Sequence, residues 1–282
     1  MSRLLASLDA PPSGRGRPIW FDAAAYGRAK LLGGGEVPWR SPAELAAFFA
    51  KLQAMFGSDA IGVDVADVFA QRAAADERLR AAMAARSRPG YALRTLLGDE
   101  QARGDAAEAV RALAAAARAV PLILTVPAPG RWLMAAAEQA GSDPGPTGAG
   151  QAETAAMYTA DVLRTFGGTP VDGLILDEGQ APVDALIHPE AYRSVINVAG
   201  HYEWPVLIRT EATPAWPQGN IPGVAVWIGS APASEPSGRW GVVTGADFWA
   251  GADPPADADL VLTAVPAQAD PEAVMKRVRA LT

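Results

Sequence analysis

The sequence of 282 residues predicts an α/β fold and, within that class, a single (β/α)8 TIM barrel. Eight short apolar runs, each ending in polar or turn residues, are mostly separated by Ala-rich stretches of helix length. Strands that alternate with helical segments indicate parallel pairing, because a parallel pair needs a long crossover between its strands. Eight such units close into a barrel of about 250 residues, which leaves little room for a second domain.

The N-terminal segment mixes Pro, Gly and Arg, so we expect residues 1–17 to form an arm over the bottom of the barrel. The barrel domain then covers residues 18–282. Its eight predicted strands are residues 18–21, 60–65, 121–126, 174–177, 206–210, 224–228, 241–244 and 260–263.

Helix start signals follow the first strand and precede the C-terminus. In Ser41-Pro42-Ala43-Glu44, Ser can cap, Pro suits the first turn and Glu can reach back to the cap, which predicts a helix to about Met55. Asp270-Pro271-Glu272 predicts a closing helix for the same reason. Between them we expect helices near residues 73–86, 105–119, 131–140, 151–166 and 189–199.

Glycine and proline predict the loops. Residues 141–150 are too rich in both for a helix or strand and predict a long loop, with a domain linker as the alternative. Residues 213–223 and 229–240 also hold too much Pro and Gly for long helices, so the last third of the barrel wall should be thin.

Composition excludes several classes of function. A formal charge of −7 argues against nucleic acid or an anionic membrane as partner, because both bind clustered Lys and Arg. The chain has no cysteine and two histidines, so we expect no metal and no cofactor. No apolar run is long enough to span a bilayer and no leader is evident, which predicts a cytoplasmic protein that binds a small molecule. A homodimer is left open.

In this fold the chemistry lies at the carboxyl ends of the strands. Polar residues gather there, and carboxylates that share a cavity shift each other's pKa and can divide acid and base roles. Capping of the following helices is the alternative role for each of them. The candidates are Asp22, Asp64, Asp67, Thr125, Asp177, Glu178, Arg209, Glu211, Trp227, Ser230, Thr244, Asp247 and Thr263.

Two of these candidates, Glu178 and Arg209, follow neighbouring strands. We expect Glu178 and Arg209 to enter one cavity, where the first moves a proton and the second anchors a carboxylate, with Asp177 and Asp67 as further catalytic candidates. A salt bridge from Arg209 to Glu178 or Glu211 is the alternative. Trp132 and Trp227 are expected near the mouth as walls of a ligand pocket, although most large aromatic residues are core.

The order of the local motifs resembles the uroporphyrinogen decarboxylase family, whose fold is similar to that of cobalamin-independent methionine synthase. The motifs are Ile19-Trp20-Phe21 with Tyr26-Gly27-Arg28, Asp64-Val65-Ala66-Asp67, Ala128-Pro129-Gly130-Arg131, Val171-Asp172-Gly173 to Asp177, and Gly245-Ala246-Asp247 to Asp253-Pro254. The resemblance implies that Arg28 holds substrate carboxylates and that Asp67 accepts hydrogen bonds from pyrrole nitrogens. Asp22 begins the segment where alanines replace the family's first arginine, and a late histidine is missing near residues 263–266.

These departures point away from a porphyrinogen and towards a smaller acid. We expect a divergent, metal-free lyase, most simply a decarboxylase, that acts on a small organic or aromatic carboxylic acid. Asp67, Asp177 and Glu178 would be catalytic, and Arg28, Arg209, Asp22, Trp132, Trp227 and Glu211 would bind the substrate. The alternatives are a methyl or alkyl transferase with an atypical site, because the usual zinc site needs cysteine, and a non-catalytic ligand-binding barrel.

Overall fold

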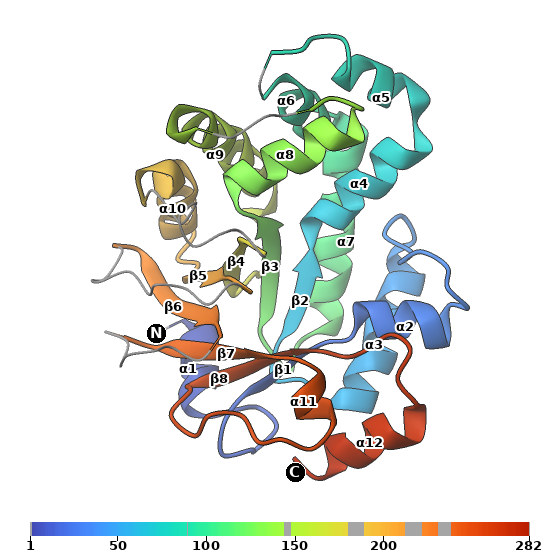
Figure 1. The fold of residues 1–282 in the computed structure, drawn as a ribbon, viewed down its shortest axis with the longest axis vertical. Helices are drawn as coiled ribbons and strands as arrows, with labels where there is room; N and C mark the ends of the chain where they lie inside the picture. Colours follow the sequence, from blue (N-terminus) through green and yellow to red (C-terminus); the bar gives the residue numbers. More distant parts are fainter. Residues whose placement is uncertain are drawn as a thin grey trace.

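A computed structural model describes residues 2–88, 90–143, 148–179, 189–211, 222–230 and 238–281. All eight predicted strands are present, each within one residue of its predicted ends, and all pair in parallel in the order β1-β8-β7-β6-β5-β4-β3-β2 (Figure 1). The strands are β1 (Ile19–Asp22), β2 (Ile61–Asp64), β3 (Leu122–Pro127), β4 (Gly173–Asp177), β5 (Val206–Arg209), β6 (Val224–Gly229), β7 (Trp240–Thr244) and β8 (Leu260–Ala264). The predicted (β/α)8 barrel is confirmed.

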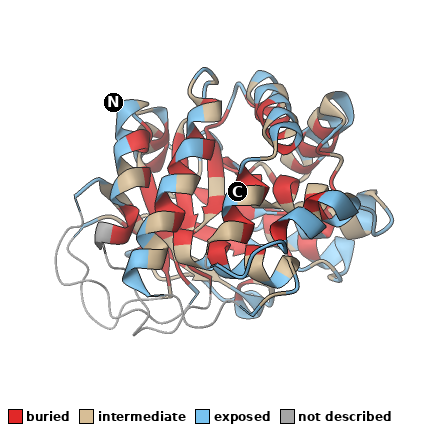
Figure 2. Cartoon of the chain, turned by 90° about the horizontal axis from the view of Figure 1, so that it is seen from above, coloured by how far each residue is buried: buried red, intermediate tan, exposed pale blue. Residues whose placement is uncertain are grey.

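Alternation along the strands divides the core into two layers. Trp20, Ile123, Ile175 and Leu207 belong to the cluster that fills the barrel interior, whereas their neighbours in sequence pack outwards against the helices. Figure 2 shows this pattern as buried residues at the centre, with exposed residues on the outer faces of the helices. The same alternation decides which polar residues at the strand ends face the mouth of the barrel.

The N-terminal arm contains the helix α1 (Arg3–Asp9), which closes the bottom of the barrel. Leu4 and Leu8 are buried in the interior cluster with residues of the strands. Leu4 lies so close to β4 that a Cβ added at Gly173 would be 2.3 Å from its side chain. Glycine is therefore required at this position so that α1 can dock.

The barrel is not closed by a full ladder between β1 and β2, which do not pair as neighbouring strands. One direct backbone bond joins them, from the Asp59 N–H to the Ile19 carbonyl at 3.0 Å. Side chains supply the rest: Ser58 Oγ accepts from the Phe21 N–H at 3.0 Å and donates to the Ala60 carbonyl at 2.6 Å, and Asp59 Oδ2 accepts from the Ile19 N–H at 2.9 Å. We call this junction the β1–β2 seam; it is held at the bottom and open towards the mouth.

The first half of the wall carries most of the described helices. These are α2 (Ala24–Leu31), α3 (Pro42–Phe56), α4 (Val65–Ala75), α5 (Glu77–Met83), α6 (Tyr91–Leu97), α7 (Glu100–Ala116) and α8 (Pro129–Gln139). The second half has α9 (Ala149–Leu163), η1 (Arg164–Phe166), η3 (Pro189–Tyr192), α10 (Arg193–His201), α11 (Ala246–Trp249) and α12 (Pro271–Arg279). No helix among the described residues is long and apolar enough to cross a membrane.

Some details differ from the sequence prediction. The crossover from β2 to β3 holds the four helices α4 to α7 rather than two, and Figure 1 shows α5 and α6 at the end of the molecule far from β1. Asp76 separates α4 from α5 because its carboxylate caps the second helix. The hydroxyl of Ser41 does not cap α3, whose start rests on Pro42 instead. The loops predicted at residues 213–223 and 229–240 lie largely outside the described residues.

Candidate functional site

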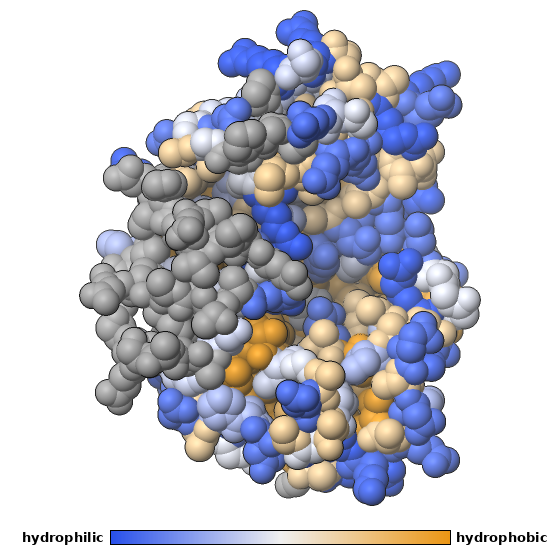
Figure 3. Space-filling model, viewed as in Figure 1, coloured by the Kyte–Doolittle hydropathy of each residue, from blue (hydrophilic) through white to orange (hydrophobic). Residues whose placement is uncertain are grey.

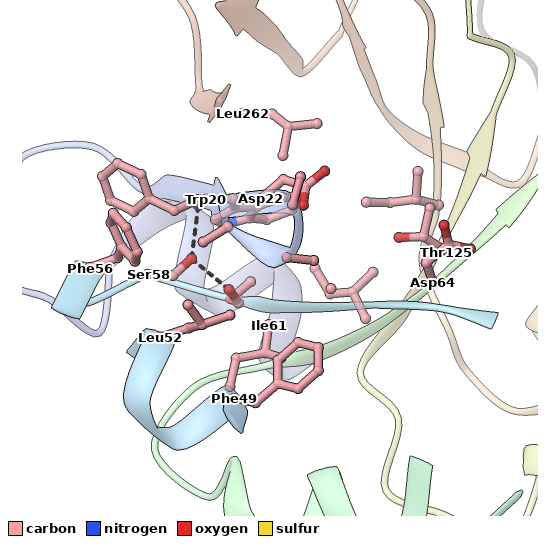
Figure 4. A pocket seen from close by; sticks show the side chains of 18 of the residues that line it. Trp20, Asp22, Phe49, Leu52, Phe56, Ser58, Ile61, Asp64, Thr125 and Leu262 are labelled. Carbon is pink, nitrogen blue, oxygen red and sulfur yellow. Dashed lines mark hydrogen bonds between the residues drawn. The ribbon is translucent and has the colours of Figure 1, made fainter. Parts of the chain in front are cut away.

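A cavity of about 350 Å³ opens at the carboxyl ends of the strands and extends sideways through the β1–β2 seam. Its size lies within the usual range for small-molecule sites, roughly 300–1,000 Å³. It has a polar part inside the barrel mouth and an apolar part between β1, β2 and α3 (Figure 4). On the surface in Figure 3, hydrophobic residues show in the central hollow, and hydrophilic residues cover most of the described rim.

The polar part is built by inward-pointing residues at or near the carboxyl ends of β1 to β5. They are Asp22, Asp64, Thr125, which lies two residues before the end of β3, Asp177 and Arg209. The inward residues of the opposite strands are apolar, as in Ile228 of β6 and Leu262 of β8. Among the described residues the mouth therefore has one polar side and one apolar side, and this asymmetry would orient a ligand.

Asp64 is the carboxylate whose chemistry is most altered by the fold. It ends β2 and caps α4, where its Oδ1 accepts from the N–H groups of Ala66 and Asp67 at 3.0 and 3.3 Å. It lies deep in the hollow, although the side chain itself is open to the cavity. Burial, reinforced by the negative charges of Asp67 and Asp22, raises the pKa of Asp64 to about 6. It can therefore carry a proton near neutral pH.

Asp22 is the second open carboxylate. Its exposed side chain lines the cavity, and no described residue donates a hydrogen bond to its carboxylate oxygens. In Figure 4 it lies above the seam beside Trp20 and Leu262, with Asp64 and Thr125 across the cavity. A ligand with a hydrogen-bond donor would find a free acceptor here.

Asp177 and Arg209 form an ion-paired group on the next strands. Asp177 is bound by Arg131, its Oδ1 accepts from the Gly179 N–H at 3.1 Å, and Arg209 Nε lies 3.8 Å from the same oxygen. Arg209 Nη2 also donates to Glu211 at 2.8 Å, so the predicted alternative of a salt bridge to Glu211 is confirmed. Asp177 faces the cavity as a compensated charge, and Arg209 faces it as a cation shared between two carboxylates.

Asp67 and Arg28 also line the cavity. Asp67 Oδ2 accepts from the indole N–H of Trp39 at 2.7 Å and from Gln71 at 3.2 Å. Arg28 Nε donates to the Gly35 carbonyl at 3.1 Å. Asp67 thus holds Trp39 against the apolar part and acts on Asp64 through its charge.

The prediction that Glu178 shares the cavity with Arg209 is wrong. Asp177 points inwards, so the following residue points to the other side of β4, where Glu178 is 8% exposed and accepts a hydrogen bond from the Tyr192 hydroxyl. Glu178 is not among the residues that line the cavity. Burial, followed by the charge of Asp177 and opposed by that of Arg131, raises the pKa of Glu178 to about 7.

The raised pKa of Glu178 predicts how the stability of the fold depends on pH. The native state holds the Glu178 proton more tightly than the unfolded chain, so the free energy of unfolding should fall as pH rises from about 4.5 to about 7. Glu178→Gln should remove that loss, roughly 3 kcal/mol in total, and should be more stable than the parent at pH 8. Urea unfolding at pH 5 and pH 8 measures it, with the exposed Glu108→Gln as control; equal pH slopes for parent and Glu178→Gln would contradict it.

The remaining predicted binding residues lie away from the cavity. Trp132 is buried in the outer layer with its ring 6.0 Å from that of Phe69. Trp227 packs in the same outer layer, because Val226 and Ile228 take the inward positions of β6. Glu211 is exposed, does not line the cavity and is joined to the site by its bond to Arg209. The prediction that these three residues line the pocket or bind the ligand directly is therefore wrong.

Some residues that shape the cavity carry only a weak signal in the sequence. Asp64 stands in the alternating run Ala60, Gly62, Asp64, and this period of two is the signal that it points inwards. The apolar residues of α3 carried no signal beyond an ordinary helix face. Within the described part of the chain, no group of three or more His, Cys, Asp or Glu side chains is placed to hold a metal.

Comparison with known proteins adds no family. No model of a protein family matches the chain, and no curated protein is significantly similar to it. The resemblance to the uroporphyrinogen decarboxylase family therefore stays a prediction, and the site is interpreted from its own geometry.

Proposed function

We propose that the chain is a metal-independent lyase, most simply a decarboxylase, that acts on a small organic or aromatic carboxylic acid. The observation that carries the proposal is the presence in one cavity of a cation, Arg209, and a carboxyl group, Asp64, whose pKa lies at about 6. The first can hold an acid and the second can supply a proton at the pH of the cell.

The proposed step balances without a further reactant. The bond between the substrate's carbon and its carboxylate breaks, the electron pair stays on carbon, and neutral CO2 leaves. Asp64 in its protonated form then gives its proton to that carbon, and the resulting carboxylate is reprotonated from the solvent. The open carboxylate of Asp22 lines the same cavity and can accept a hydrogen bond from a donor group of the substrate.

A transferase and a binding protein remain as alternative functions. Alkyl transfer to a thiol would need an activated nucleophile, and the sequence has no cysteine to help bind zinc for it. A non-catalytic barrel is favoured by one observation, the ion pairs that hold Arg209 to Asp177 and Glu211. Turnover separates these functions.

The test is a panel of small aliphatic and aromatic acids, screened for thermal stabilisation of the protein and then for CO2 release. Arg209→Lys keeps the charge but loses the planar fork, so it should weaken binding of an accepted acid by about 1–3 kcal/mol. Arg239→Lys, at an exposed arginine that pairs with Asp9 far from the cavity, is the control. Acids that bind without CO2 release would favour the binding barrel, and unchanged affinity in Arg209→Lys would remove this residue as the anchor.

A further inference from the structure

We infer that the ligand is amphipathic: an aryl ring or short alkyl tail lies in the apolar part of the cavity beside α3, and its polar head meets the strand ends. The inference rests on the proposed function for the acidic nature of the head, but not for the tail. We call the apolar part the side lobe; it is lined by Val37, Trp39, Phe49, Leu52, Phe56 and Ile61.

The side lobe is a built feature of the fold. It exists because β1 and β2 do not form a ladder above Ser58, whose hydroxyl bridges the two strands at the bottom of the seam. Gln53 Nε2 of α3 donates to the Ser58 carbonyl at 2.8 Å and so holds the helix against the seam. In Figure 4, Phe49, Leu52 and Phe56 gather on one side of the cavity, with Thr125 and Asp64 on the other.

Close packing of α2 on α3 supports the wall of the lobe. A Cβ added at Gly27 would be 2.7 Å from the ring of Phe48, so this ring of α3 packs directly on the backbone of α2. Trp39 is buried and held by its bond to Asp67. The wall is therefore closely packed. An apolar group that enters the lobe would contact apolar side chains, and the wall would not need to move.

Trp20 lies where the two parts of the cavity meet, and it is 3% exposed. Its indole N–H is itself buried and has no hydrogen-bond partner among the described residues, so Trp20 offers the ligand the carbon atoms of its ring and not this donor. The cavity of about 350 Å³ is more than twice the roughly 150 Å³ of a cavity that binds benzene, so a ring and a polar head fit together.

The test is ligand-observed NMR titration of acetate, phenylacetate and 3-phenylpropionate into the purified protein. Affinity should rise along the series, by roughly threefold to fourfold for each methylene equivalent buried. Leu52→Trp fills the side lobe and should abolish this gain while acetate binding stays unchanged. Lys51→Trp places the same side chain at an exposed position of α3 and should behave like the parent.

Two further arms keep the outcomes distinct. If Leu52→Trp does not fold by circular dichroism, Leu52→Ala enlarges the lobe instead and should shift the optimum to 4-phenylbutyrate. The neutral 3-phenylpropionamide tests whether the polar head must be a carboxylate. If amide and acid bind equally, the side lobe is still supported as the tail site, but the proposed carboxylate substrate is not. A gain along the series that survives in folded Leu52→Trp, an optimum that does not change in Leu52→Ala, or no gain at all in the parent would overturn the side lobe as the tail site.

Discussion

Asp64→Asn is expected to cut turnover of an accepted acid by ~10²–10⁴ while leaving its binding nearly unchanged. The asparagine keeps an oxygen for the N–H groups of Ala66 and Asp67, so α4 remains capped. What it loses is the exchangeable proton. Because burial and the charges of Asp67 and Asp22 raise the pKa of this group to about 6, the acid form is present below that pH and the parent's turnover should decline as pH rises through it.

The measurement is kcat and KM across pH 5 to 8 for an acid found in the screen. Asp270→Asn is the matched control, since Asp270 caps α12 through the Ala273 N–H at 2.9 Å and lies outside the cavity lining. Asp67→Asn should shift the midpoint of the pH profile downwards by removing one of the charges that raise it. If Asp64→Asn keeps its turnover, another group, Asp22 first, carries the proton.

Much of the fold was predictable because each strand is bounded by strong local signals. The run from Val206 to Ile208 is apolar on both faces, and Arg209 ends it where side chains meet the mouth. Asp270 and Pro271 fixed the start of α12 by capping chemistry that acts within one turn. Elements whose stabilising interactions lie within a few residues of each other could therefore be predicted from the sequence.

The site was less predictable because it depends on orientation. Asp177 and Glu178 are adjacent and equally acidic, and only their alternation on β4 sends one to the cavity and the other to Tyr192. The side lobe depends on a pairing that is absent, between β1 and β2, and absence of a ladder leaves no mark in either strand. Phe49 and Leu52 are therefore indistinguishable in sequence from residues that only pack.

The seam that creates the side lobe must be stabilised elsewhere, and Asp59 is the residue that does so. It is fully buried directly before β2, and its carboxylate accepts from the N–H groups of Ser13 and Ile19 at 2.8 and 2.9 Å. Arg15 Nη1 lies 3.3 Å from the same carboxylate and is itself only 5% exposed. One side chain thus joins the N-terminal arm, β1 and the start of β2.

Asp59→Ala is expected to lower the free energy of unfolding by about 3–5 kcal/mol, the usual cost of removing one partner of a buried ion pair. The loss would come from the Arg15 charge and two backbone donors that stay buried without the carboxylate. Urea unfolding, followed by circular dichroism, measures it. Asp9→Ala removes an exposed aspartate that pairs with Arg239 at 2.8 Å, and it should cost less than about 1 kcal/mol. Similar small losses in both variants would mean that Ser58 and the remaining backbone contacts hold the seam without Asp59.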